Sequence, residues 1–152
     1  MMSALTSVDI REVVFVNEQA KHDYETMPAE AVLAADARTT AIQNHMRLPR
    51  NQRQPLKGKL ADIDEARILF DDNTYRVYYL TSFKAAIYIL DAGMKKSPRG
   101  SEISKQQIDR LIERKKVAVK HYMTNEKWFM ARMTERLARR AALLADDDSA
   151  TP

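Results

Sequence analysis

Alternation of apolar and polar residues is clearest between residues 66 and 80, where it predicts a β-hairpin. β-branched and aromatic residues flank a turn-forming cluster at residues 71–73, which is the pattern of two strands joined by a tight turn. With Asp72-Asn73 as the two-residue turn, four cross-strand pairs are predicted: Leu69 with Arg76, Arg67 with Tyr78, Ile68 with Val77, and Phe70 with Tyr75.

The two faces of this hairpin differ in character, because successive side chains of a strand point to opposite sides. One face is apolar and requires a core; its members are Ile68, Phe70, Tyr75, Val77 and Tyr79. The other face carries Arg67, Arg76 and Tyr78, with only Leu69 as an aliphatic neighbour. Like charges on one sheet face repel each other, so we expect an anion-binding surface that stays open to solvent.

The first half of the chain predicts a strand followed by two helices. Residues 13–16 form a short apolar run suited to a first strand. Residues 17–48 are rich in Ala and Glu and favour helix, with a break near Pro28. The expected result is an acidic helical hairpin.

The second half adds one more strand and a long helical region. Residues 85–90 form a continuous apolar run typical of a strand, and residues 91–100 contain turn-forming Gly and Pro. Ser104 with Gln107 forms a capping box that opens an amphipathic helix, and residues 123–145 continue helical. The predicted fold class is therefore α+β: a small antiparallel sheet of three to five strands, with an N-terminal helical hairpin and C-terminal helices on one face.

An irregular connector at residues 47–59 carries only basic charge. It holds Pro and Gly and no acid, and its basic residues are Arg47, Arg50, Arg53, Lys57 and Lys59. Such a segment is either a solvated loop or an arm that contacts phosphate. The arm is favoured because the connector leads directly into the hairpin, so these five residues are candidate RNA-binding residues.

Charge is distributed unevenly over the 152 residues, whose net charge is +4. Residues 1–46 hold 3 Lys+Arg against 7 Asp+Glu, whereas residues 47–145 hold 22 against 11. The basic part suggests a nucleic-acid or acidic-protein partner, although a solvated basic surface without a ligand is an equally good interpretation of charge alone.

Composition bounds the remaining possibilities. No apolar run approaches the roughly 18 residues of a membrane span, and residues 1–12 lack the apolar run of a signal peptide, so a cytoplasmic protein without membrane partner is expected. The absence of cysteine excludes disulfides and thiolate zinc sites. The three histidines, His22, His45 and His121, lie outside residues 65–96, and no metal or other cofactor is expected. Asp62 and Asp64 are interpreted as loop charge.

Several features follow one another in a recognisable order. They are a Glu-x-Arg strand (Glu65, Arg67), a Tyr-Arg-Val strand (residues 75–77), a strand ending in Leu90, a Lys95-Lys96-Ser97 turn, and the helix opened by Ser104. This order resembles the RelE/ParE/HigB superfamily of bacterial type II toxins, and most of all its phage-derived, HigB-like branch. The resemblance covers roughly residues 10–122. It departs from the branch at Asp91-Ala92-Gly93-Met94, where many members carry a His and then an aromatic residue, so it does not extend to His-dependent chemistry.

The resemblance implies a toxin of a toxin-antitoxin pair, acting as a metal-independent endoribonuclease on mRNA, with the ribosome as a possible platform and an antitoxin as partner. The implied catalytic residues are Arg67, Arg76, Tyr78, Lys95 and Lys96. RNA cleavage suits this set because the ribose 2′-hydroxyl is the nucleophile, while Arg and Lys stabilise charge on the phosphate. Glu65 and Asp91 are the acidic candidates for a general base. Two alternatives remain open: a ParE-like inhibitor of DNA gyrase, and a non-catalytic, phage-derived regulatory binding protein.

The resemblance also implies a division of the chain. Residues 1–122 form the RelE/ParE-like toxin domain, and residues 123–152 form a helical extension that ends in a disordered tail from Asp146. The apolar residues of this extension, such as Trp128, Met133 and Leu137, predict that it packs on the domain beside the Ser104 helix and leaves the arginine face open.

Overall fold

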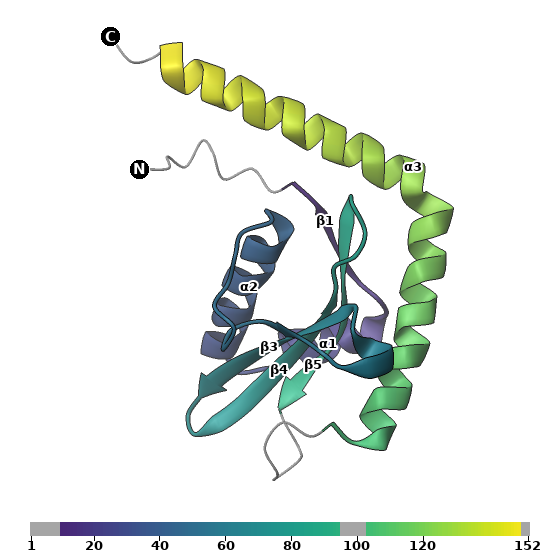
Figure 1. The fold of residues 1–152 in the computed structure, drawn as a ribbon. Helices are drawn as coiled ribbons and strands as arrows, with labels where there is room; N and C mark the ends of the chain where they lie inside the picture. Colours follow the sequence, from purple (N-terminus) through teal and green to yellow (C-terminus); the bar gives the residue numbers. More distant parts are fainter. Residues whose placement is uncertain (1–9, 95–102, 150–152) are drawn as a thin grey trace.

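A mixed five-stranded sheet lies between helices on both of its faces (Figure 1). The structure is a computed structural model that describes residues 10–94 and 103–149. Its strands are β1 (Glu12–Phe15), β2 (Gln54–Pro55), β3 (Ile63–Phe70), β4 (Asn73–Leu80) and β5 (Ala86–Met94), in the order β1-β5-β4-β3-β2. Its helices are α1 (Glu18–Glu25), α2 (Ala29–Gln43), the short 3-10 helix η2 (Gly58–Leu60) and α3 (Lys105–Ser149). The predicted α+β class and the helical hairpin broken at Pro28 are confirmed.

One strand pair departs from the expected antiparallel sheet. β1 runs parallel to β5, with Val13 beside Ile87 and Phe15 beside Ile89, whereas the β2–β3, β3–β4 and β4–β5 pairs are antiparallel. The parallel pair is possible because the two strands are far apart in the chain, and the helical hairpin and three strands between them supply the crossover that parallel neighbours require.

The hairpin turn lies one residue earlier than predicted. Asp71 and Asp72 are its two central residues, with φ of 50° and 61°, as the type I′ turn favoured in two-residue hairpins requires. Phe70 therefore pairs with Asn73 and Arg67 with Arg76, so the predicted pairing is wrong by two positions. A two-residue shift keeps every side chain on its predicted face, because the period of a strand is two.

The apolar face of the hairpin forms the first core, beneath α1 and α2. Ile68, Val77 and Tyr79 are buried there together with Ile87 and Ile89 of β5. Small residues of α2, such as Ala31 and Ala35, are fully buried against them, so the helix backbone approaches the sheet closely. Inside this core the Tyr79 hydroxyl lies 2.8 Å from Thr39 Oγ1, which satisfies a polar group that burial would otherwise penalise.

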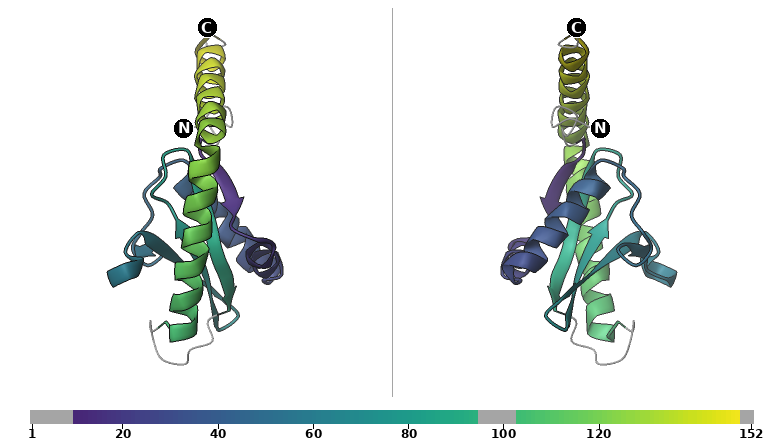
Figure 2. Two further views of the ribbon diagram at one scale, coloured as in Figure 1. Left: turned by 90° about the vertical axis from the view of Figure 1, so that its right-hand side faces the viewer. Right: turned by 90° about the vertical axis from the view of Figure 1, so that its left-hand side faces the viewer.

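The second sheet face is covered by α3, which contradicts the expectation that it stays open. Figure 2 shows α3 on the side of the sheet opposite to α2. Tyr88 and Leu90 of β5 are buried under Leu111 and Tyr122 of α3. The reason lies in β5, because residues 85–90 are all buried, and a strand that is apolar on both faces needs cover on both faces.

Helix α3 bends at Asn125, whose backbone is non-helical at φ −115° and ψ 15°. Beyond the bend the helix axis turns sharply, and the second half of α3 crosses the end of the molecule at which β1 begins (Figure 1), so the predicted packing beside the Ser104 helix is wrong. The first residues of this second half contact the body: Phe129 and Met133 are buried, and Arg136 Nη2 lies 2.8 Å from Glu12 Oε2. The helix runs to Ser149, and thus includes the first residues of the expected tail.

Candidate functional site

The β3–β4 ladder places Arg67 and Arg76 directly opposite each other, with one carboxylate for both. Glu65 precedes them on the same face of β3, opposite Tyr78. Its Oε1 lies 2.7 Å from Arg67 Nε and its Oε2 lies 3.4 Å from Arg76 Nη1. Arg67 and Arg76 thus lie together, as predicted. The anion that they bind in this structure is the carboxylate of Glu65, a residue of the same strand pair. We call Glu65, Arg67, Arg76 and Tyr78 the arginine cluster.

Most of the arginine cluster is buried, which corrects the expectation of an exposed anion-binding face. Glu65 is 1% exposed, Tyr78 4% and Arg76 5%, whereas 33% of the Arg67 side chain is open to solvent. Burying Arg76 beside Glu65 is tolerated because a buried charge that is paired avoids most of the desolvation cost. Arg67 is therefore the member of the cluster that an external phosphate can reach in this arrangement.

Burial raises the pKa of the Tyr78 hydroxyl to about 12, and the nearby charge of Glu65 acts in the same direction. At neutral pH this hydroxyl therefore keeps its proton. It can donate a hydrogen bond or a proton, but it cannot act as a base.

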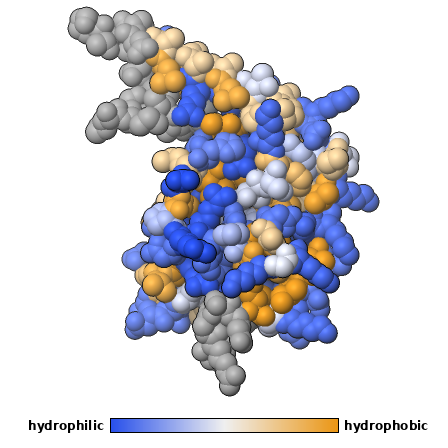
Figure 3. Space-filling view, viewed as in Figure 1, coloured by the Kyte–Doolittle hydropathy of each residue, from blue (hydrophilic) through white to orange (hydrophobic). Residues whose placement is uncertain are grey.

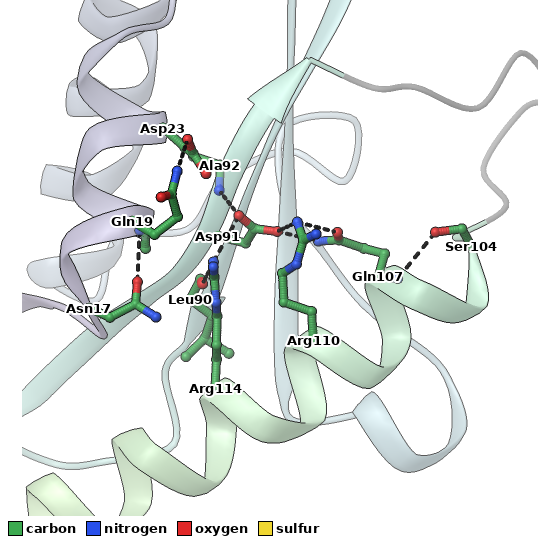
Figure 4. Close-up of polar contacts among 11 residues, drawn as sticks. Asn17, Gln19, Asp23, Leu90, Asp91, Ala92, Ser104, Gln107, Arg110 and Arg114 are labelled. Carbon is green, nitrogen blue, oxygen red and sulfur yellow. Dashed lines mark hydrogen bonds and ion pairs between the residues drawn. The ribbon is translucent and has the colours of Figure 1, made fainter.

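Asp91 forms a second charged site on the same sheet face and binds the start of α3 (Figure 4). Gln107 Nε2 donates to Asp91 Oδ2 at 2.5 Å, and Arg114 Nη1 donates to Oδ1 at 3.0 Å. Arg110 Nη1 lies 3.5 Å from Oδ2. Asp91 is itself buried, so these side chains attach the first turns of α3 to β5.

A bulge in β5 places Asp91 in this position. Tyr78 pairs with Asp91 but Tyr79 pairs with Ile89, so Leu90 is the extra residue. Bulges of this kind change the direction of a side chain. Here Leu90 and Asp91, although adjacent, both contact α3: Leu90 packs in the core beneath it and Asp91 binds its polar side chains. Residues 91–94 are consequently strand rather than the start of the predicted turn.

Capping at the start of α3 agrees only partly with the prediction. The Gln107 backbone N–H donates to Ser104 Oγ at 3.1 Å, as an N-cap requires. The Gln107 side chain, however, binds Asp91 rather than returning to Ser104. Gln107, Arg110 and Arg114 recur at spacings of three and four residues, so they share one helix face; this spacing is a signal in the sequence that could have identified the anchor.

The predicted basic connector does not join the arginine cluster as a unit. Arg53 Nη2 lies 2.6 Å from Asp64 Oδ2, and Asp64 alternates with Glu65 along β3, so this ion pair lies on the opposite, α2 side of the sheet. Arg47 and Arg53 line an open depression of about 570 Å³ there. Lys59 instead lies beside α3, and Arg50 and Lys57 are exposed. Asp64 is a buried strand residue rather than loop charge.

The depression beside Arg53 has a strongly positive environment. Arg11 donates from Nη2 to the Ile42 carbonyl at 2.5 Å and from Nη1 to the Thr81 carbonyl at 3.0 Å. Burial and the nearby charge of Arg53 lower the pKa of Arg11 to about 10. Burial, with Arg11 and Arg53, also lowers the pKa of His45. The sequence does not indicate that Arg11, His45 and Arg53 lie together, because they come from segments that are separated along the chain.

The remaining predicted catalytic residues, Lys95 and Lys96, lie outside the described residues. Within residues 10–94 and 103–149, no three His, Asp or Glu side chains lie close enough together to hold a metal ion. In the same part of the chain no helix is long and apolar enough to cross a membrane.

Comparison with known families places the chain in one of them. No curated protein matches the chain at a significant level. Residues 23–116 match the family described as phage derived protein Gp49-like (DUF891). The matched span contains the whole arginine cluster, Asp91 and the first turns of α3. Since it covers more than half of the chain, the protein belongs to the phage-derived Gp49-like (DUF891) family, within the RelE/HigB-type toxin group.

Proposed function

We propose that this protein is the toxin of a type II toxin-antitoxin pair and that it cleaves mRNA without a metal ion, in the cytoplasm, with the ribosome as a candidate platform. The observation that carries the proposal is the pair Arg67–Arg76, held across two strands beside Glu65 and Tyr78 within the Gp49-like span. Two guanidinium groups at adjacent positions can bind the oxygens of one phosphate.

In this mechanism the ribose 2′-hydroxyl attacks the neighbouring phosphorus and the 5′-oxygen leaves. Arg67 receives the phosphate first because it is the open member of the cluster. Tyr78 keeps its proton at neutral pH, so its role is to donate to a phosphate oxygen or to the leaving group. Glu65 and Asp91 are the acidic candidates for accepting the 2′-hydroxyl proton, but both are buried and already paired, so either would have to be uncovered before it could act as the base. Lys95 and Lys96 would add positive charge.

The test is induction of the gene in a bacterial host, with growth, RNA 5′ ends and DNA supercoiling followed together. We expect growth arrest and new mRNA 5′ ends while supercoiling stays normal. Arg67→Ala should abolish both effects with the fold retained, whereas the matched control Arg139→Ala, an exposed arginine on the far half of α3, should remain toxic. Arg76→Ala is a poorer test because Arg76 is buried against Glu65.

Loss of supercoiling with intact mRNA would instead assign the protein to the gyrase inhibitors. Growth arrest that persists in Arg67→Ala would refute the role of the arginine cluster.

One observation favours a second candidate, a non-catalytic binding protein. Arg76 and Tyr78 are buried and Asp91 is bound by three side chains of α3, so among the described candidate residues of this sheet face only Arg67 is open to solvent. Normal growth and unchanged RNA after induction of a folded, soluble protein would support this candidate.

A further inference from the structure

A groove between η2 and the first half of α3 combines an apolar floor with a basic rim. It has a volume of about 410 Å³ and is lined by Lys59, Ile112, Lys115, Lys116, Val119 and Lys120. Figure 3 shows apolar surface interrupting the hydrophilic surface where α3 passes η2. The groove lies outside the arginine cluster and the depression beside Arg53, and nothing in the proposed chemistry uses it.

The floor of the groove belongs to an apolar stripe that the fold leaves partly uncovered. Leu111, Ala118 and Tyr122 form the stripe of α3 that is buried on the sheet. Ile112, Val119 and Met123 follow one residue behind at the same spacing and form a second stripe along the helix. Ile112 is half-buried against the second core, whereas Val119 is 37% exposed and Met123 65% exposed, so the stripe becomes exposed towards its C-terminal end.

The lysines on the rim are only partly neutralised. Lys115 Nζ lies 2.7 Å from Asp62 and Lys116 Nζ lies 3.2 Å from Glu113, the latter an exposed pair within one helix. No carboxylate of the described residues lies within ion-pair distance of Lys59 or Lys120. The rim therefore keeps positive charge on both sides of the floor, from two separate elements.

These features fit one class of partner better than another. RNA would use the lysines but would gain little from an exposed Val–Met stripe. A helix with acidic residues flanking an apolar stripe would use both, as in helix-in-groove recognition supported by charge complementarity. We propose that this groove binds an acidic amphipathic helix of a partner protein. The identification of this partner as the antitoxin rests on the proposed function.

The test is direct binding of a designed peptide of about 18 residues, with Leu at helical spacings of three and four and Glu on both flanks. Controls are a scrambled peptide of equal composition, poly-glutamate and a single-stranded RNA oligonucleotide. Val119→Asp removes the apolar floor and Lys120→Glu reverses the rim charge. Their matched controls are Val117→Asp, at a residue of α3 that is 53% exposed and outside the groove, and Lys105→Glu. Circular dichroism checks that every variant is folded.

We expect Val119→Asp and Lys120→Glu each to weaken binding of the designed peptide roughly tenfold or more, and the two controls to change it less than about twofold. Equal binding of the scrambled peptide or poly-glutamate would overturn the proposal. RNA that binds as tightly and is lost in the same variants would assign the groove to RNA and also overturn it. Because this measurement does not involve toxicity, a non-toxic protein that still binds the peptide through Val119 and Lys120 would refute the proposed function alone.

Discussion

Glu65 determines what the two arginines beside it can do. Its carboxylate contacts both Arg67 and Arg76 and is almost completely buried. One carboxylate faces two guanidinium groups, so the cluster keeps an excess of positive charge, but any phosphate must compete with Glu65 for Arg67. A single side chain thus controls both the stability of the sheet face and its affinity for anions.

Glu65→Gln should destabilise the protein by about 3 kcal/mol, because it removes the negative charge that faces the buried guanidinium of Arg76. Urea unfolding followed by circular dichroism measures the effect. The matched control is Glu113→Gln, an exposed pair with Lys116, which should cost less than about 0.5 kcal/mol. Equal stabilities of the two variants would show that Glu65 does not stabilise the cluster.

Alkaline stability depends on buried tyrosines. Burial raises the pKa of Tyr78 to about 12 and also raises that of Tyr24, Tyr79 and Tyr88. Above pH ~10 the unfolded chain releases phenolic protons that the folded chain retains, so stability is complete below that pH and falls as the pH rises towards 12, by on the order of 2 kcal/mol for Tyr78 alone. Phenolate absorbance should therefore rise for these tyrosines only together with unfolding. Full phenolate formation in a folded protein would contradict the prediction.

At the scale of elements, the β3–β4 hairpin depends on its turn. Asp71 and Asp72 both adopt positive φ, a region that costs an ordinary residue free energy and that Asn and Gly enter more readily. The double substitution Asp71→Asn with Asp72→Gly should therefore stabilise the protein by about 0.5 to 1 kcal/mol. Asp109→Gly, an exposed position of α3, should instead cost a few tenths of a kcal/mol. Thermal unfolding distinguishes the two signs.

Asp91 anchors the first half of α3 to the sheet. Asp91→Ala removes the acceptor for Gln107, Arg110 and Arg114, so the free energy of unfolding should fall by about 3 kcal/mol. Hydrogen exchange should accelerate in the first half of α3 and not in α1 or α2. Glu113→Ala on the same helix is the control and should leave the exchange pattern unchanged. Unaltered protection of α3 in Asp91→Ala would show that the apolar contacts alone hold the helix.

At the scale of the whole molecule, two layers of helix cover one sheet, and the bend at Asn125 separates the half of α3 that lies along the sheet from a second half whose first residues complete the core. Phe129 and Met133 lie just beyond the bend and are buried, whereas Trp128, Leu137 and Leu144 are exposed. We propose the division into residues 1–122 and 123–152 as one of function, in which the beginning of the extension still supports the toxin domain.

Truncation after Tyr122 should lower the melting temperature by on the order of 10 °C and expose apolar surface, because it removes Phe129, Met133 and the Arg136–Glu12 contact. Truncation after Leu137 keeps these groups and should change the melting temperature little. Thermal unfolding and dye binding measure both. A protein truncated after Tyr122 that is as stable as the full chain but no longer binds an antitoxin would make the extension a partner-binding element.

Local patterns in the sequence determined most of the elements and the faces of the hairpin. The helical break at Pro28, the N-cap at Ser104 and the sorting of Ile68, Val77 and Tyr79 onto one face depend on neighbouring residues only, so they could be predicted. The register at Asp71-Asp72 could not, because adjacent Asp and Asn residues allow more than one two-residue turn. The parallel β1–β5 pair joins segments about 70 residues apart, and no local pattern specifies such a pair.

For the candidate site too, the sequence determined which residues share a face, and the tertiary structure determined their burial and pairing. The sequence identified Arg67, Arg76 and Tyr78 as one group, because period-two alternation keeps them on one face when the register shifts by two residues, as it does here. Only the tertiary structure decided that this face is covered, since cover depends on where α3 packs, and α3 is drawn there by Tyr88 and Leu90 of a different strand. It also decided that Glu65 lies between the arginines and that Asp91 binds α3, because burial and pairing of charges arise from contacts between elements and are not properties of any one segment.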